Sequence, residues 1–202
     1  MAGAAPPSAF AATALDLATI PLGEVFGRIY LSRYPDPLGY AKTLSRFSDP
    51  RRRLPAKRFG VLYLGSSLKV CFVEAVLRDQ RDGHAGDLLL DESDLAKRSY
   101  ATIEVVSALS LVDLQKDGPV RMGIPSDVAR GAKQSLARKW SVAFHEHPDQ
   151  PDGVIYPSRL NGETNIALYD RAIAKVGPSA VAPLLKQSEL TRVLSDLRIG
   201  LQ

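Results

Sequence analysis

The segment Phe59–Asp79, FGVLYLGSSLKVCFVEAVLRD, constrains the fold more than any other part of this chain. Its first residues form an apolar run bounded by Gly60 and Gly65, and this pattern predicts a short buried strand. Ser66 or Ser67 then predicts a helix start, because a serine hydroxyl can accept a hydrogen bond from an unsatisfied N–H of the first turn. We therefore expect a strand, a tight turn and a helix here.

Glu74 is the unusual residue of the predicted helix. The residues around it, from 68 to 77, are apolar on almost every face, which is typical of a buried helix. A glutamate is almost never fully buried without a partner, and an unpaired buried charge is costly. Either a structural arginine or a polar ligand in a cleft should therefore face Glu74.

Composition narrows the class of protein. The chain has 202 residues, of which 45% are hydrophobic and 24% charged, and it is long enough for one globular domain with a full core. The apolar runs are far shorter than the roughly 18 residues of a membrane-spanning helix, and the Ala-rich start lacks the charged region of a secretory signal. The single cysteine, Cys71, cannot form an internal disulfide, so a cytoplasmic location is expected.

Short strands interspersed with a few helices, without regular βαβ alternation, predict an α+β fold. Strands are expected at 24–31, 88–90 and 102–106 and in the segments SLVDLQ, GVIYPSRLNG and TNIALYDRA. Apolar residues at steps of four predict a helix over 125–147. The expected organisation is an N-terminal arm (1–23), a main domain (24–175) and a helical tail packed on it (176–202).

The segment 32–58 is long, irregular and rich in proline, and such loops in compact domains are usually functional or disordered. It ends in a basic patch made of Arg51, Arg52, Arg53, Lys57 and Arg58, in a chain of net charge +4. The patch could bind nucleic acid, a nucleotide phosphate or an acidic protein, or it could be a solvated loop without a partner.

Several familiar sites are absent from the sequence. There is no P-loop, no GxGxxG, no HExxH and no cysteine pair for zinc, so we expect no metal. His145 and His147 are two residues apart and point to different faces of a helix, which makes them a poor metal pair.

A set of polar residues in strand-like surroundings remains: Arg28, Arg46, Tyr63, Tyr156 and Ser158. Each has a structural explanation, since Arg28 could pair with Glu74, Tyr63 could be a core aromatic and Ser158 could be a turn residue. Together they have a chemical logic. An arginine fork suits a phosphate, a tyrosine ring can stack on a flat heterocycle, and a carboxylate in a water-poor cleft can stabilise a developing cation. These groups would suffice to cleave the nicotinamide–ribose bond of NAD.

Four segments carry a resemblance to a known family: GRIYLSRYPDPLGY, SRFSDP, FGVLYLGSSLKVCFVEAVLRD and DGVIYPSR. In this order they resemble the RES domain, the toxin half of bacterial RES–Xre toxin–antitoxin pairs. The family is named for an Arg, a Glu and a Ser, which look like Arg28, Glu74 and Ser158 here. The resemblance covers about residues 24 to 172.

The resemblance implies a fold similar to that of ADP-ribosyltransferases, with two packed β-sheets around an NAD cleft and flanking helices. It also implies NAD as the substrate. By position, Arg28 would hold the phosphates or ribose of NAD, Arg46 would be a second anionic contact and Tyr63 would stack on nicotinamide. Glu74 would bind the ribose hydroxyls and stabilise the oxocarbenium-like transition state, and Ser158 would hydrogen-bond ribose or position Arg28.

Tyr30 and Tyr156 are further candidates for contact with NAD, and Ser135 is an alternative to Ser158 as the functional serine. The resemblance implies a toxin that transfers ADP-ribose to a cellular protein and arrests growth. A glycohydrolase or phosphorylase that depletes NAD is the alternative, and a nucleic-acid-binding module using the basic patch is an alternative of another class. The implied partner is an Xre-like antitoxin that blocks the cleft, so that contact with nucleic acid is indirect.

Overall fold

The computed structural model describes residues 4–40, 42–51, 54–78 and 80–202. Its centre is an eight-stranded sheet of order β1-β6-β7-β8-β3-β2-β5-β9. The strands are β1 (Leu17–Ile20), β2 (Val25–Leu31), β3 (Val61–Gly65), β5 (Arg98–Val105), β6 (Leu109–Asp113), β7 (Gly153–Pro157), β8 (Thr164–Tyr169) and β9 (Val176–Pro183). A separate parallel pair is formed by β4 (Leu88–Leu90) and β10 (Ile199–Leu201).

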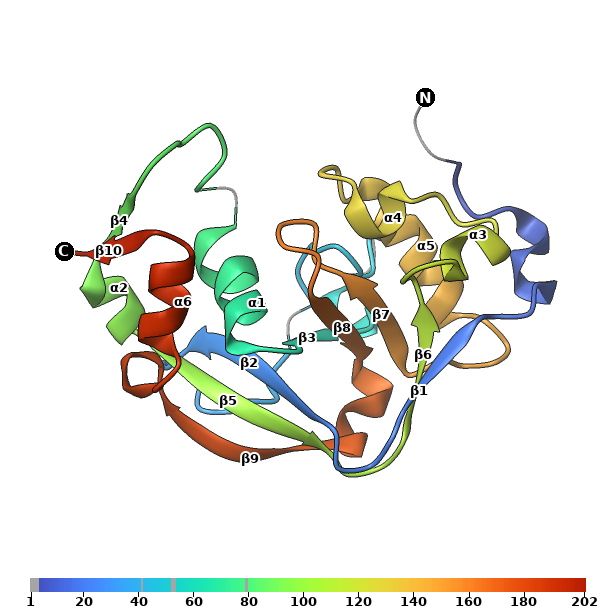
Figure 1. Ribbon diagram of the computed structural model, residues 1–202. Helices are drawn as coiled ribbons and strands as arrows, with labels where there is room; N and C mark the ends of the chain where they lie inside the picture. The colour runs from blue at the N-terminus through green and yellow to red at the C-terminus, as the bar shows by residue number, and fades with distance from the viewer. Residues whose placement is uncertain (1–3, 41, 52–53, 79) are drawn as a thin grey trace.

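The helices lie in two groups (Figure 1). Over the β2–β5–β9 side lie α1 (Leu68–Phe72), α2 (Glu92–Ala96) and α6 (Leu190–Asp196), and over the β6–β7–β8 side lie α3 (Gly118–Arg121), α4 (Asp127–Arg130) and α5 (Ser135–His145). Short 3₁₀ turns occur at Ser8–Ala12, Pro55–Lys57, Asp170–Lys175 and Leu184–Lys186. The predicted α+β class is confirmed.

The sheet is nearly divided in two. β2 pairs with β5 along all seven of its residues, but with β3 at one position only, Gly27 opposite Gly65. Glycine is required there: a Cβ on Gly27 would lie 2.2 Å from the Tyr100 hydroxyl oxygen, and one on Gly65 would lie 2.6 Å from Val70. The two packed sheets expected from the sequence are therefore two halves of one sheet, joined by a single bridge.

The helix after β3 begins as the sequence predicts. Ser67 is its N-cap and accepts a hydrogen bond from the backbone N–H of Val70. Beyond Phe72 the helix widens into a π-helical turn, Val73–Leu77, and its apolar side chains pack with Ile29 of β2 and with α6. Each of these buried side chains contributes about 1.5–3 kcal/mol relative to an exposed one.

The ends of the chain differ from the expected arm and helical tail. Leu17–Ile20 forms the edge strand β1, paired with β6, and Phe10 packs edge-on against Trp140 at 4.9 Å between ring centroids. Val176–Pro183 forms β9, which pairs with β5 at the other edge of the sheet, before the helix α6. Both ends thus contribute to the sheet.

The helix expected over 125–147 is two helices. α4 ends at Gly131, which adopts an extended conformation, and α5 starts at Ser135. A Cβ on Gly131 would lie 2.6 Å from the Asp127 carbonyl oxygen, so the close turn depends on glycine. Among the described residues, no helix combines the length and hydropathy needed to cross a bilayer.

Candidate active site

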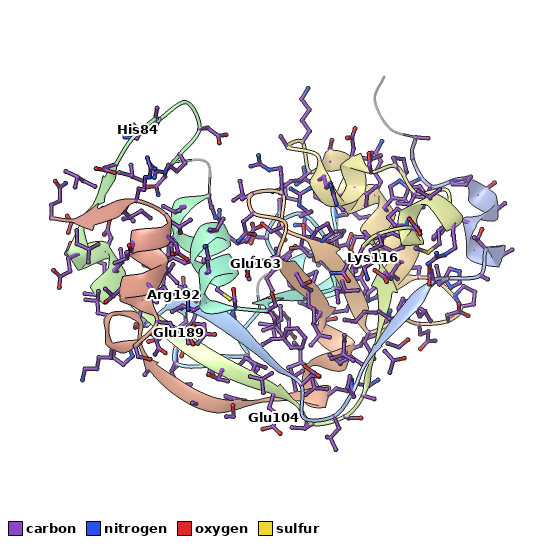
Figure 2. The ribbon with its side chains drawn as sticks, viewed as in Figure 1. His84, Glu104, Lys116, Glu163, Glu189 and Arg192 are labelled. Carbon is purple, nitrogen blue, oxygen red and sulfur yellow. The ribbon has the colours of Figure 1, made fainter. Side chains whose placement is uncertain are left out.

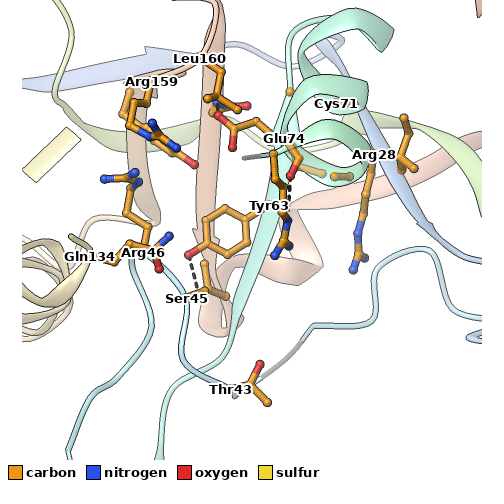
Figure 3. A pocket seen from close by; sticks show the side chains of 18 of the residues that line it. Arg28, Thr43, Ser45, Arg46, Tyr63, Cys71, Glu74, Gln134, Arg159 and Leu160 are labelled. Atoms are coloured by element: carbon orange, nitrogen blue, oxygen red, sulfur yellow. Dashed lines mark hydrogen bonds between the residues drawn. The ribbon is translucent and has the colours of Figure 1, made fainter. Parts of the chain in front are cut away.

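A cavity of about 530 Å³ opens where β2 and β3 diverge from their glycine bridge. This volume is within the usual range for small-molecule sites. The walls come from β2, β3, the helix with its π-helical turn, the strands β7 and β8, and residues 43–46 of the long loop (Figure 3). Part of the long loop, for which a functional or a disordered role is expected, therefore lies at the cavity.

Glu74 lies in the π-helical turn and lines the cavity. Interruptions of this kind in α-helices are frequent at functional sites. Its Oε1 accepts hydrogen bonds from the Ser158 hydroxyl (2.7 Å) and from the Asn165 amide (3.2 Å). Two neutral donors, one from β8 and one just after β7, thus contact this carboxylate.

Arg28 follows the bridging Gly27 on β2 and lines the cavity. Its guanidinium donates a hydrogen bond to the Pro37 carbonyl and lies 5.6 Å from the centroid of the Tyr30 ring. Burial lowers the pKa of Arg28, and nearby Asp36 opposes the shift. An arginine keeps its charge in proteins, so a partly desolvated cation with several N–H donors faces the site.

Tyr63 lies on β3 with its half-buried ring in the cavity wall. Its hydroxyl forms a hydrogen bond with the Ser45 hydroxyl and accepts one from the Phe47 backbone, both at 2.9 Å. Burial raises the pKa of Tyr63, so the phenol stays neutral. The hydroxyl thus fixes the long loop while the ring remains available for stacking.

Arg46 lies on the long loop and donates to the Gly131 carbonyl at 2.8 Å. Figure 3 shows it with Arg159 and Gln134 on one side of Tyr63, while Arg28 lies on the other side. The cavity is therefore cationic on both sides of its central carboxylate, an arrangement that favours an anionic ligand.

The other predicted residues lie at different depths. Ser158 is buried behind Glu74, and Tyr156 lines the cavity with its ring packed edge-on against Phe47 at 4.8 Å. Tyr30 and Ser135 are not lining residues, and Ser135 is exposed at the start of α5. Of the two candidate serines, the structure brings Ser158 to Glu74.

Cys71 also lines the cavity, one helical turn before Glu74. Burial raises the pKa of its thiol to about 12. A nucleophilic cysteine needs its thiolate, so Cys71 serves as an apolar wall residue.

Among the amide and charged residues of this wall, sequence analysis assigned no role to Asn165, Arg78, Arg159 and Gln134. A signal for the first exists, because asparagine is depleted in strands and Asn165 interrupts the buried strand β8. Arg78 and Arg159 carry no local signal. Arg78 comes at the end of the helix that contains Glu74, Arg159 directly follows Ser158, and each looks like an ordinary charged residue.

The family model described as the RES domain matches residues 24–190, and the chain therefore belongs to the RES domain family. The matched range includes β9, whereas the sequence analysis expected the main domain to end at residue 175. The arginine, glutamate and serine that resemble the family's namesake residues are those placed around the cavity above.

Two known proteins extend this finding. The protein named "Probable toxin y4kH" from Sinorhizobium fredii is 40% identical over 124 residues, which cover 61% of this chain and 98% of that protein. The crystal structure of the M. tuberculosis MbcT–MbcA toxin–antitoxin complex contains a chain with a TM-score of 0.59 and 19% identity, covering 89% of this chain and 91% of the other. The expected RES-type, ADP-ribosyltransferase-like fold is thereby confirmed.

Proposed function

We propose that this protein is the toxin of a toxin–antitoxin pair, and that it cleaves NAD at the nicotinamide–ribose bond and transfers ADP-ribose to a cellular protein. The observation that carries the proposal is the Glu74 carboxylate, held by neutral donors in a cavity with arginines on both sides. Membership of the RES domain family and the similarity to a protein named as a probable toxin support it.

In this proposal the cationic sides of the cavity bind the diphosphate of NAD. Arg28 supplies one guanidinium and Arg46 a second, and planar forks of this type bind phosphate oxygens in pairs. The Tyr63 ring stacks on the nicotinamide, and its neutral hydroxyl stays with the loop.

Glu74 acts on the ribose. When the bond between C1′ and the nicotinamide nitrogen breaks, the electron pair leaves with neutral nicotinamide and the ribose gains oxocarbenium character. A fixed carboxylate beside it stabilises this charge more in the transition state than in the ground state. The acceptor's nucleophile then forms its bond to C1′ and loses its proton to solvent.

The long loop is the proposed surface for the protein acceptor. Leu44 lines the cavity and is 63% exposed, and the same loop exposes Tyr34, Tyr40 and Leu54. Apolar residues exposed on a loop that also lines the cavity suit contact with a protein, which supports transfer over hydrolysis.

An Xre-like antitoxin is the proposed partner, because an enzyme that consumes NAD harms its own cell unless it is neutralised. The arginines of the cavity would attract an acidic segment of such a protein. Co-expression with the protein encoded next to this gene should restore growth, and growth arrest that continues in its presence contradicts the pairing.

The main test is incubation with NAD labelled in the adenylate part, with and without cell lysate. Label retained on a discrete protein is the expected result. Free ADP-ribose alone would favour a glycohydrolase, and a phosphorylated product that requires added phosphate would favour a phosphorylase. Unchanged NAD in every condition contradicts the proposal.

Glu74→Gln should remove NAD consumption, and Glu104→Gln is the matched control. Glu104 lies on β5 at the side of the molecule away from the cavity (Figure 2) and is not a lining residue. Equal activity in both variants contradicts the role of Glu74.

The nucleic-acid alternative loses part of its basis. Arg51 forms ion pairs with Asp49 and Glu146, which neutralise it, while Arg52 and Arg53 lie outside the described residues. Steeply salt-dependent binding to DNA or RNA by the isolated protein would favour this alternative.

A further inference from the structure

We propose that Asn165 is a positioning residue that fixes one oxygen of Glu74 and thereby directs the other toward the substrate. This inference rests on the proposed NAD chemistry. Asn165 is 4% exposed, lines the cavity and belongs to β8, where it lies opposite Gly65 of β3 and Tyr156 of β7.

Two hydrogen bonds to the Glu74 carboxylate end on the same atom. The Asn165 amide nitrogen lies 3.2 Å from Oε1, and the Ser158 hydroxyl oxygen lies 2.7 Å from it. In the bond from Ser158 the hydroxyl is the donor, because a carboxylate oxygen accepts, and the same hydroxyl oxygen accepts the Leu160 N–H at 3.1 Å. Both donors act on Oε1, so Oε2 is the oxygen that we place toward the substrate.

These bonds join the two halves of the sheet. Glu74 belongs to a helix packed with Ile29 of β2 and with α6, whereas Asn165 and Ser158 belong to the β7–β8 side. A second contact also joins this helix to the β7–β8 side: the Ser67 hydroxyl, which caps the helix, donates to Glu163 at 2.5 Å. The orientation of the carboxylate is therefore set from across the split.

This placement explains why an amide suits position 165. A glutamate side chain has several rotatable bonds, and orienting it before the reaction reduces the entropy lost in the transition state. An alanine would leave Oε1 with one donor, and an aspartate of the same shape would place a second negative charge beside the first.

Steady-state kinetics of NAD consumption by Asn165→Ala and Asn165→Asp test this role. Asn165→Ala should lower kcat by about 10- to 100-fold with a KM for NAD within about twofold, a smaller loss than for removal of a donor that contacts the reacting atoms. In Asn165→Asp the acid limb of the pH–rate profile should also move to higher pH, because two neighbouring carboxylates resist joint ionisation. A residue that only supports the fold would not move this limb.

Asn161→Asp is the matched control. Asn161 is exposed in the loop between β7 and β8 and its amide donates to Glu163, so the same chemical change should leave kcat and the pH profile unaltered. Normal turnover by Asn165→Ala overturns the proposal, and so does a raised KM with unchanged kcat, which would make Asn165 a substrate contact.

A crystal structure of Asn165→Ala, or of the isosteric Asn165→Asp if the alanine variant does not fold, separates this inference from the proposed function. The Glu74 carboxylate should change its orientation, or adopt more than one, in the variant. An unchanged carboxylate overturns the positioning role whether or not the protein consumes NAD, whereas wild-type protein that leaves NAD intact overturns only the proposed function.

Discussion

Asp49 in the long loop and Glu74 in the π-helical turn are carboxylates that the protein holds in different ways. Asp49 has a side chain with 0% exposure, and it accepts hydrogen bonds from Nε and Nη2 of Arg51, each at 2.8 Å. Glu74 accepts hydrogen bonds from the neutral groups of Ser158 and Asn165 and lines the cavity. The Asp49 carboxylate is thus buried against a cation of the protein, whereas the Glu74 carboxylate borders the space where a ligand would lie.

The difference separates a structural region from a functional one. Arg51 also pairs with Glu146 at the end of α5, so the Asp49 cluster ties the loop to a helix of the main core. Glu74 instead faces a cavity. Changes in the Asp49 cluster should therefore alter stability, and changes at the Glu74 site should alter turnover.

The largest expected effects come from Glu74→Gln and Asp49→Ala. Glu74→Gln should reduce NAD turnover by about 100-fold or more with an almost unchanged free energy of unfolding. Asp49→Ala should lower that free energy by about 2 kcal/mol, less than for a fully buried pair because Arg51 is partly exposed, with normal turnover per folded molecule. Urea unfolding measures the stability and NAD consumption measures the turnover. A loss of stability alone in Glu74→Gln, with a loss of turnover alone in Asp49→Ala, would contradict the comparison.

Arg28→Lys tests the cationic wall of the site. Lysine keeps the charge but loses the planar fork, so the KM for NAD should rise by about 10-fold with a smaller change in kcat. Arg33→Lys, just beyond the end of β2, is the control because Arg33 contacts only the neighbouring Tyr34 among the interactions described. An unchanged KM for Arg28→Lys would contradict phosphate binding by this residue.

Tyr63 belongs to both regions, since its hydroxyl holds the loop and its ring faces the cavity. Tyr63→Phe should lower the free energy of unfolding by about 1 kcal/mol and leave the KM for NAD nearly unchanged. Tyr63→Leu should also raise the KM, because the stacking face is lost. If the phenylalanine variant alone raises the KM, the hydroxyl rather than the ring contacts the substrate.

The sequence predicts the local parts of this arrangement. The strand and helix of Phe59–Leu77, the serine cap and the unusual position of Glu74 all depend on neighbouring residues, and all appear in the structure. The α+β class was also accessible. The resemblance singled out Ser158 but assigned it to ribose or Arg28, whereas its hydroxyl donates to Glu74 in the structure.

The features that the sequence does not predict depend on contacts between residues far apart in the chain. The single bridge between Gly27 and Gly65 joins strands 38 positions apart in the chain, and no local pattern states that their pairing stops there. The edge strand β1 has only four residues in an Ala-rich segment, and its partner β6 is far away in sequence. Asn165 is noticeable as an asparagine in a buried strand, but its contact with Glu74 joins residues 91 positions apart. Pairing and register depend on tertiary packing that periodicity does not describe.

The smallest expected effect is the pH dependence of stability at His145, in the region of the Asp49 cluster. Its ring stacks on Phe59 at 4.1 Å, and burial, with Arg171 nearby, lowers the pKa of His145 to about 4. Between about pH 6.5 and 4 the unfolded chain binds a proton that the folded one does not, so stability falls as the pH falls. Because the ring is only half-buried, about 1 kcal/mol or less is expected. His145→Phe should remove this slope in urea unfolding at pH 7 and pH 5 without changing NAD turnover per folded molecule, and a changed turnover would place His145 in the functional region instead.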